Sequence, residues 1–423
     1  MSLKKDNYLP RLIDKTIDRE LKTFGAICIE GPKWCGKTWT SLAHANSVFY
    51  VGDPAQNFNN RELARMNTEN VFKEDYPELI DEWLEVPAIW DAVRFKVDQD
   101  KISGKYILTG SVLPVRNKFM HSGVGRIKRI RMYPMSLYES GDSTGEVSLK
   151  NLFDGKFKTV ISNSNMNLDK IIYLILRGGW PENIGKSESE VIDVASSYIE
   201  NTLLYDINKV EDKERDVSKI RKLIASLARN ESTLVTNETL IKDIKENDNS
   251  DIYRDTIKDY IEILKELFII EDQEAFSSNI RSKARIRNTP KKHFIDPSLA
   301  CATLNLSSSK LKSDLNTLGF MFEGMCYRDL CVYAESLNGK VYQYKDGNGL
   351  EIDNIIELKN GDFGAFEVKL GANQIDDAAK NLIKFSKNVS KKPKVLCVIV
   401  GDLNSAYRRD DGVYVVPIGL LKD

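Results

Sequence analysis

The chain has 423 residues, which at roughly 100–200 residues per domain predicts about two to four domains. Its net charge of −1 neither favours nor excludes a nucleic-acid partner, so only local charge can bear on that question. No stretch approaches about 18 consecutive apolar residues, and residues 1–6 contain no apolar signal core. The six cysteines show no metal-binding spacing and are typical of buried thiols in a reducing compartment. We therefore expect a cytoplasmic chain that does not enter a membrane.

The segment at residues 31–38, GPKWCGKT, matches the phosphate-binding pattern of Gly, four residues, Gly, Lys and Ser or Thr. The apolar run 26–29 predicts a buried parallel strand before it, and residues 39–44 can open a helix after it, which disfavours a chance match in a turn. Backbone N–H groups of the loop and of the helix N-terminus would then surround phosphates. Lys37 would reach the β- and γ-phosphates, and the Thr38 hydroxyl would ligate Mg²⁺. The predicted nucleotide-binding residues are Gly31, Pro32, Lys33, Trp34, Cys35, Gly36, Lys37 and Thr38.

Polar residues follow two further predicted strands. An ATPase needs a carboxylate that holds Mg²⁺ and a glutamate that polarises the attacking water. Asp81 is a candidate for the first role and Glu82 for the second, whereas the alternative is an acidic helix start. Thr109 and Ser111 can touch the γ-phosphate, although both can also serve as turn residues. Arg126 is a candidate for stabilising transition-state charge, in its own subunit or in a neighbour's.

Residues 8–139 resemble the archaeal and bacterial AAA+-superfamily ATPases (AAA_14 type) that carry a C-terminal domain of unknown function (DUF4143). The resemblance rests on the phosphate loop, LIDEW at 79–83, VPAIWDAVR at 86–94 and LTGS at 108–111. It implies an ATPase that uses ATP and Mg²⁺, with Asp81 and Glu82 as its metal and catalytic carboxylates. Leu84 stands where such proteins commonly have Gln, which implies slow hydrolysis if that Gln helps to position water.

The sequence pattern in the middle of the chain predicts helices followed by a hairpin. Residues 141–215 indicate a helical linker or lid region. Residues 216–300 predict a helix, a short helix, a long helix and a hairpin, which is the winged-helix order. Four basic residues at spacing two share one face of the hairpin and would contact DNA or RNA phosphates. The alternatives are a solvated strand face or a face paired with acidic surface. These residues are Arg281, Lys283, Arg285 and Arg287.

The C-terminal part predicts two strands, at 350–358 and 363–370, joined by the turn signal Asn-Gly at 360–361. With a three-residue loop, Asp353 lies opposite Glu367, and Glu351 lies opposite Lys369, all on one face of the sheet. Two carboxylates and a lysine on one face can hold Mg²⁺ and orient a water against a phosphate. The alternative is an ordinary cross-strand ion pair.

This arrangement resembles the PD-(D/E)xK nuclease-like fold, with Glu323 on a preceding helix, Asp353 on one strand and Glu367-x-Lys369 on the next. The resemblance implies that Asp353, Glu367 and Lys369 are catalytic and that Glu323, Asp353 and Glu367 bind metal. The fold also persists in proteins whose site is inactive, since fold does not determine function.

We therefore expect an α/β protein of four segments: an AAA+-like P-loop NTPase domain (1–140), a helical linker or lid (141–215), a winged-helix-like domain (216–300) and a restriction-endonuclease-like α/β domain (301–423). The favoured function is ATP binding and hydrolysis by an enzyme acting on or regulated by nucleic acid, with a Mg²⁺-dependent nuclease site. The alternative is an ATP-dependent signalling or assembly switch whose nuclease-like domain is inactive and binds a protein. A homo-oligomer would suit either function.

Overall fold

The computed structural model describes residues 3–112, 120–162, 165–208, 215–245, 253–278 and 289–423. The chain divides into two compact units. Unit 1 comprises Met1–Pro134 with Glu266–Phe268, and unit 2 comprises Met135–Lys265 and Ile269–Asp423. Unit 2 thus contains nearly all of the three segments that were predicted for residues 141–423.

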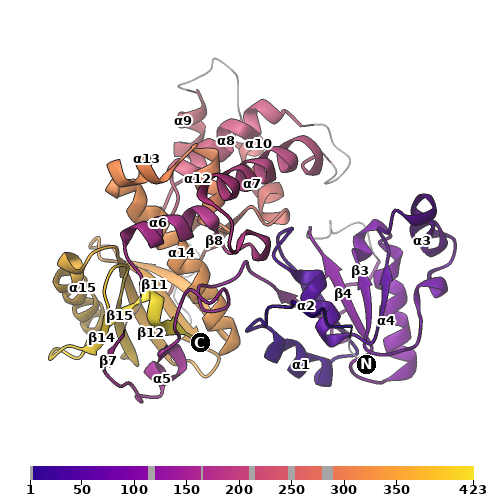
Figure 1. Ribbon diagram of the computed structural model, residues 1–423, viewed down its shortest axis with the longest axis horizontal. Coiled ribbons are helices and arrows are strands. Elements are labelled where there is room, and N and C mark those ends of the chain that lie inside the picture. Colours follow the sequence, from indigo (N-terminus) through magenta and orange to yellow (C-terminus); the bar gives the residue numbers. More distant parts are fainter. Residues whose placement is uncertain (1–2, 113–119, 163–164, 209–214, 246–252, 279–288) are drawn as a thin grey trace. The chain divides into compact units, whose positions relative to one another are not determined.

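Unit 1 is built on a parallel sheet with the strand order β2-β3-β4-β1-β5, drawn in indigo to purple in Figure 1. Strands β1, β3 and β4 are buried along their whole length, as expected for short apolar runs in a parallel sheet. Because the strands run in parallel, their carboxyl ends meet at one edge, where α/β proteins bind ligands. The elements are α1 (Asp14–Thr23), β1 (Ala26–Glu30), α2 (Lys37–His44), β2 (Ser47–Tyr50), α3 (Ala55–Met66), β3 (Glu78–Asp81), α4 (Ala88–Asp100), β4 (Tyr106–Gly110) and β5 (Ile127–Arg131).

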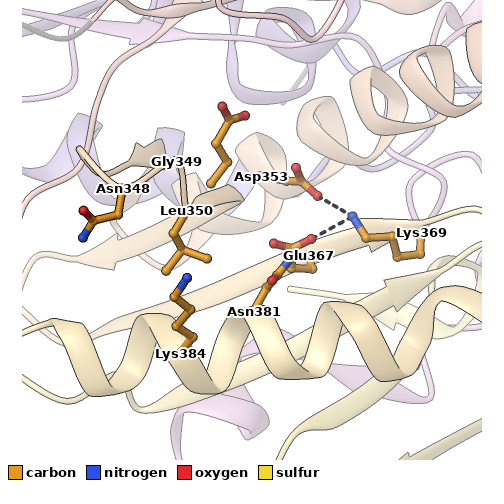
Figure 2. Close-up of a pocket in the computed structure, with 9 residues that line it drawn as sticks. Asn348, Gly349, Leu350, Asp353, Glu367, Lys369, Asn381 and Lys384 are labelled. Carbon is orange, nitrogen blue, oxygen red and sulfur yellow. Dashed lines mark hydrogen bonds and ion pairs between the residues drawn. The ribbon is translucent and has the colours of Figure 1, made fainter.

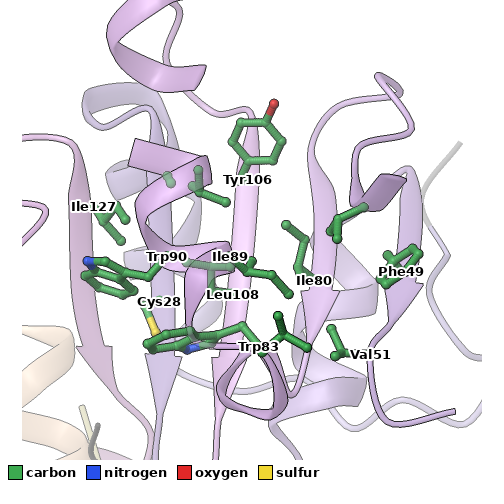
Figure 3. Packing of buried hydrophobic residues seen from close by; sticks show 14 of the residues in the cluster. Cys28, Phe49, Val51, Ile80, Trp83, Ile89, Trp90, Tyr106, Leu108 and Ile127 are labelled. Carbon is green, nitrogen blue, oxygen red and sulfur yellow. The ribbon is translucent and has the colours of Figure 1, made fainter. Parts of the chain in front are cut away.

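Aromatic and aliphatic side chains form the core against β3 and β4 (Figure 3). Trp83 and Trp90 are fully buried, with ring centroids 4.9 Å apart, and they share one cluster with Ile80 and Leu108. Truncating a buried aromatic residue of this size typically costs about 3–5 kcal/mol. This packing immobilises the turn that follows β3, which carries Glu82.

The first half of unit 2 is helical. In the segment predicted as winged-helix-like, three helices precede a β8–β9 hairpin, in the predicted order. The helices are α5 (Leu149–Phe153), α6 (Leu168–Arg177), α7 (Glu188–Asn201), α8 (Val217–Arg229), α9 (Asn237–Lys245), α10 (Arg254–Glu266), α12 (Pro297–Thr303) and α13 (Ser308–Ser313), and the hairpin strands are β8 (Ile270–Gln273) and β9 (Lys291–Phe294).

The second half of unit 2 contains a seven-stranded mixed sheet in the order β10-β11-β12-β13-β15-β14-β7 (Figure 1). Strands β10, β11 and β12 pair antiparallel, whereas β12, β13 and β15 pair in parallel. Helices α14 and α15 both pack against this sheet. The elements are β7 (Val160–Ile161), α14 (Leu315–Ser336), β10 (Gly339–Lys345), β11 (Glu351–Leu358), β12 (Phe363–Lys369), α15 (Ile375–Asn388), β13 (Val395–Val400), β14 (Ser405–Arg408) and β15 (Tyr414–Pro417); two short strands, β6 (Val147–Ser148) and β16 (Leu421–Lys422), pair separately.

The predicted register between β11 and β12 is confirmed. Asn354 pairs with Phe366, so Asp353 lies opposite the residue that follows Phe366. The hairpin closes where the N–H of Leu358 donates to the carbonyl of Asp362 at 2.8 Å. Gly361 has a φ of +80°, which glycine adopts without strain. The Asn-Gly signal therefore fixed which side chains share a face.

Candidate functional sites

The phosphate loop joins β1 to α2 in unit 1. A Cβ atom added to Gly31 would lie 2.2 Å from the carbonyl oxygen of Met132, and Gly36 has a φ of +99° at the start of α2. Both positions therefore require glycine. The buried guanidinium of Arg11 also supports the loop, because its Nη1 donates to the carbonyl of Cys35 at 2.8 Å.

Lys37 is 5% exposed and lies along the inside of this loop. Its Nζ donates to the carbonyl oxygens of Gly31 at 3.0 Å and Pro32 at 2.8 Å. A phosphate oxygen would be a stronger acceptor, since hydrogen bonds between two charged groups are shorter and stronger than those to neutral carbonyls. The lysine is thus held beside the position that a triphosphate would take.

The polar side chains predicted at three strand ends converge in the structure. The hydroxyl of Thr38 donates to Asp81 Oδ1 at 2.9 Å, and the hydroxyl of Thr109 donates to the same oxygen at 2.6 Å. A hydroxyl and a carboxylate side by side fit Mg²⁺, which takes one or two protein oxygens and keeps several waters when it binds nucleotide. Thr38 and Asp81 would hold the ion here.

Glu82 lies next to this pair in a conformation that is unusual for its type. Its φ of 57° is in the left-handed region, and its Oε1 accepts a hydrogen bond from Ser111 Oγ at 2.9 Å. It lies at the start of the short 3₁₀ helix Trp83–Glu85, as the helix-start alternative expects, but its side chain makes no capping bond to that helix. Burial, together with the charge of Asp81, raises the pKa of the Glu82 carboxyl above its ordinary value. A raised pKa suits a group that accepts a proton from water.

We expect Glu82→Gln to bind ATP as the wild type does but to hydrolyse it roughly 100-fold more slowly or worse, because general-base assistance is lost. Single-turnover hydrolysis and nucleotide binding, measured side by side, check this. Glu85→Gln, which removes a half-exposed carboxylate paired with Arg61, is the matched control and should hydrolyse ATP normally. Unchanged turnover in Glu82→Gln would remove Glu82 from the reaction.

Arg126 lies at the opposite edge of the sheet from the phosphate loop. It immediately precedes β5, whose first residue, Ile127, pairs in parallel with Ala26 at the start of β1. Its side chain is 48% exposed, and its Nε is 2.7 Å from Asp98 Oδ1. Within the described part of the chain it makes no contact with its own phosphate loop, so a role in its own subunit is not supported. A role in a neighbouring subunit stays a prediction.

The second site lies in unit 2, where Asp353, Glu367 and Lys369 line a cavity of about 330 Å³ (Figure 2). Lys369 Nζ is 2.7 Å from Glu367 Oε2 and 3.4 Å from Asp353 Oδ2. The N–H of Val368 also donates to Asp353 Oδ2 at 2.9 Å. Glu351 lines the same cavity but pairs with Lys345 instead. The predicted cross-strand geometry thus brings two carboxylates and one ammonium group together.

The charges of this cluster shift the pKa values of its members in opposite directions. Burial raises the pKa of Glu367, and so does the negative charge of Asp353. Burial also raises the pKa of Glu323, again with a contribution from Asp353. For Asp353 itself, burial is outweighed by the ammonium groups of Lys369 and Lys291, and its pKa is lowered. Asp353 is therefore ionised, and the two glutamates would gain from a further cation.

The metal site predicted at Glu323, Asp353 and Glu367 stays a prediction, and lysines lie between its carboxylates. Among the described residues, no group of three or more His, Cys, Asp or Glu side chains is arranged to hold a metal ion. The physical reason is that lysines lie between the carboxylates: Lys291 Nζ is 2.5 Å from Glu323 Oε1, and Lys369 bridges the other two. Asp353 and Glu367 already share one positive charge, the ammonium group of Lys369. These two carboxylates therefore remain suited to a divalent ion.

Sequence reasoning missed Lys291, which lies on β9 and approaches the cluster from outside the predicted C-terminal domain. It also missed Arg11. The sequence of β9 does not show that Lys291 contacts the cluster, whereas the neighbouring Lys292 pairs with Asp272. The predicted nucleic-acid contacts cannot be placed, since they lie outside the described residues: Arg281, Lys283, Arg285 and Arg287.

A buried hydrogen-bonded chain fastens the β8–β9 hairpin beside the cluster. Glu231 Oε1 is 3.0 Å from His293 Nδ1, and His293 Nε2 is 3.0 Å from Gln273 Oε1. Gln273 Nε2 then donates to Asn354 Oδ1 at 2.9 Å and to the carbonyl of Asp353 at 3.0 Å. This order of donors is consistent with a protonated Glu231 and a neutral His293. Burial raises the pKa of Glu231 to about 8 and lowers that of His293 to about 3.

We expect Glu231→Gln to change how stability depends on pH. Above pH 6.5, the ordinary pKa of His293, this histidine is neutral in both states, while Glu231 stays protonated only when folded, up to pH 8. The contribution of Glu231 to wild-type stability should therefore fall by about 1.4 kcal/mol per pH unit over this range. Glutamine can replace the protonated carboxyl, so the melting temperature of the variant relative to wild type should rise from pH 6.5 to pH 8. A difference that is constant with pH would contradict a protonated Glu231.

Three family models match successive parts of the chain. An AAA domain model matches residues 23–141, a domain of unknown function (DUF8612) matches residues 168–310, and a domain of unknown function (DUF4143) matches residues 318–421. No curated protein matches the chain. With the geometry of the phosphate loop, these matches support a P-loop ATPase-like domain at residues 23–141 and a DUF4143 domain at residues 318–421.

Solved structures that match parts of the chain do so at low sequence identity and with TM-scores below 0.5. The Walker-type ATPase PABY2304 of Pyrococcus abyssi has 13% identity and a TM-score of 0.44, over 72% of this chain and 98% of its own. The replication initiator DnaA bound to AMPPCP and single-stranded DNA has 14% identity and a TM-score of 0.29, over 62% and 92%. A STAND protein with a tetratricopeptide repeat sensor, PH0952 from Pyrococcus horikoshii, has 11% identity and a TM-score of 0.22, over 80% and 48%. Among the described helices, none is both long enough and apolar enough to cross a membrane.

Proposed function

We propose that unit 1 binds ATP with Mg²⁺ in the phosphate loop and hydrolyses it. The observation that carries this proposal is the convergence of the Thr38 and Thr109 hydroxyls on Oδ1 of Asp81, in the site that also holds the buried Lys37. Mg²⁺, when bound, would neutralise charge on the β- and γ-phosphates. Glu82 accepts the proton of the attacking water and is oriented by the hydroxyl of Ser111.

This proposal is tested by measuring ATP turnover alone and in the presence of duplex DNA, single-stranded DNA and RNA. Stimulation by one of these polymers would support an ATPase that acts on nucleic acid. Equal rates in all four reactions would favour a protein partner. No ATP turnover under any condition would contradict the hydrolytic role of Glu82.

We propose further that unit 2 carries a nuclease-like site of the PD-(D/E)xK type. Four predicted residues, Glu323, Asp353, Glu367 and Lys369, lie in one cluster, and the chain order α14-β10-β11-β12-α15-β13 forms a mixed sheet around it. Asp353 and Glu367 would hold a divalent cation, and Lys369 would orient a water and neutralise charge on the phosphate. The substrate class is then a phosphodiester of DNA or RNA.

We also propose that the helical part before this site is winged-helix-like and that the basic residues at positions 281, 283, 285 and 287 contact phosphates. The order of its helices and strands supports the proposal. Helix α10 itself alternates basic and acidic side chains, including Arg254, Lys258 and Asp255, so it offers no uniformly positive face to a groove. Contact through backbone phosphates would be salt-sensitive and independent of sequence.

A second function is an ATP-dependent signalling or assembly switch whose nuclease-like domain is inactive and binds a protein partner. The observation that favours it is the ion pairing of Lys369 with both Asp353 and Glu367, which also suits an ordinary structural ion pair. The two functions differ in one outcome: only the first predicts divalent-cation-dependent cleavage that requires Lys369.

A further inference from the structure

Lys291 brings a second ammonium group to the nuclease-like cluster from an earlier part of the chain. Its Nζ is 2.5 Å from Glu323 Oε1 and 3.8 Å from Asp353 Oδ1, and its side chain is 8% exposed. Lysine is almost never buried to this degree unless it is paired. Removing only one member of a buried pair leaves an uncompensated charge, so the Lys291–Glu323 pair acts as a unit.

The β8–β9 hairpin fixes the position of this ammonium group. Phe276, just after β8, donates its N–H to the carbonyl of Gln343 on β10 at 2.6 Å. Gln273 at the end of β8 binds the carbonyl of Asp353 itself. Because alternate residues of a strand face opposite sides, Lys292 points away from the cluster and pairs with Asp272. Gln273 is also the β8 residue that pairs with Lys291, so the anchored end of β8 holds Lys291 beside the carboxylates.

The two lysines of the cluster differ in their access to the cavity. Lys369 is 24% exposed and lines the cavity together with Asp353 and Glu367 (Figure 2). Lys291 and Glu323 are not among the described residues that line this cavity. A ligand entering the cavity therefore meets Asp353, Glu367 and Lys369, with the Lys291–Glu323 pair behind them.

We propose that Lys291 is a positioning residue that acts as a fixed internal counter-ion for Glu323. It withdraws Glu323 from metal binding, so that the site takes one divalent cation, held by Asp353 and Glu367. The inference rests on the nuclease-like site proposed above and deepens it, since it assigns a number of metal ions and a role to a residue outside the C-terminal segment. With every group ionised, three carboxylates and two lysines leave a single net negative charge, which one divalent cation more than neutralises.

The test measures Mn²⁺ binding to the nucleotide-free full-length chain by isothermal titration calorimetry. Wild type should bind one Mn²⁺ ion that Asp353→Asn abolishes. The paired variant Lys291→Met/Glu323→Gln removes both charges behind the cavity and should bind Mn²⁺ within about threefold of wild type. Lys291→Met alone frees Glu323 and should bind Mn²⁺ at least about tenfold more tightly, since a third carboxylate becomes available. Thermal unfolding of each variant shows whether it is folded.

The outcomes distinguish a failure of the role assigned to Lys291 from a failure of the nuclease-like site on which that role rests. Loss of Mn²⁺ binding in the paired variant would show that Glu323 is a ligand and would overturn the inference, while the nuclease-like site stands. Unchanged affinity in a folded Lys291→Met would overturn it too. If Lys291→Met does not fold, the paired variant, which leaves no buried charge unpaired, decides alone. Absence of Asp353-dependent Mn²⁺ binding in wild type would overturn both proposals.

Discussion

Lys37→Ala is expected to abolish ATP turnover and to weaken ATP binding by at least about 100-fold. The ammonium of Lys37 is buried inside the phosphate loop, where it is bonded only to two neutral carbonyls in the described part of the chain. It is therefore placed to form strong charge-assisted bonds with phosphate oxygens, which alanine cannot replace. Turnover measured by phosphate release and binding measured by titration with ATP both check this expectation.

Lys22→Ala is the control, because Lys22 is an exposed lysine of α1 in the same unit and lies outside the phosphate loop. It should retain turnover within a few-fold of wild type, which separates the specific role of Lys37 from a general loss of positive charge. Equal loss in both variants would indicate that a loss of positive charge matters rather than the position of one ammonium. Normal turnover in Lys37→Ala would show that the nucleotide binds elsewhere.

Lys369→Ala is expected to reduce divalent-cation-dependent cleavage of DNA or RNA by roughly 100–1,000-fold, in the range observed when one donor that stabilises transition-state charge is removed. Lys369 is the ammonium that faces the cavity and contacts both Asp353 and Glu367. ATP turnover by unit 1 should not change. Cleavage of a panel of duplex, single-stranded and RNA substrates, measured with Mg²⁺ and with Mn²⁺, checks the prediction.

The control for this variant is Lys380→Ala, which removes an exposed lysine of α15 that pairs with Asp377. It should cleave as wild type does. If wild type itself cleaves nothing across the panel, the nuclease function is contradicted and the signalling or assembly switch is favoured. If Lys369→Ala cleaves normally, the activity lies outside this cluster.

The first site could be predicted because its parts are local in sequence. The phosphate loop is one continuous motif, and Asp81, Glu82 and Ser111 each follow a short apolar strand. Carboxyl ends of parallel strands share an edge, so their proximity needed no knowledge of distant contacts. Arg126 shows the converse, since it precedes its strand and therefore lies at the other edge.

The second site could be predicted only in part. The turn at Asn360–Gly361 fixed the register that places Asp353 opposite Glu367. The electrostatic outcome could not be predicted, because it depends on Lys291, which is distant in sequence and reaches the cluster only after the β8–β9 hairpin docks. The series of hydrogen-bonded side chains that runs from Glu231 to Asn354 could not be predicted, for the same reason. Sequence periodicity predicts which residues share one face of a helix or strand. It does not predict which of these faces pack against one another.

The central claim is that a nucleoside triphosphate binds in the loop between β1 and α2. Calorimetric titration of the full chain with ATP and Mg²⁺ tests it most directly, with Lys37→Ala titrated under the same conditions. We expect saturable binding of one ATP per chain in the wild type and binding at least about 100-fold weaker in the variant. Absence of binding of ATP, ADP and GTP at millimolar concentrations to a folded wild-type chain would contradict it.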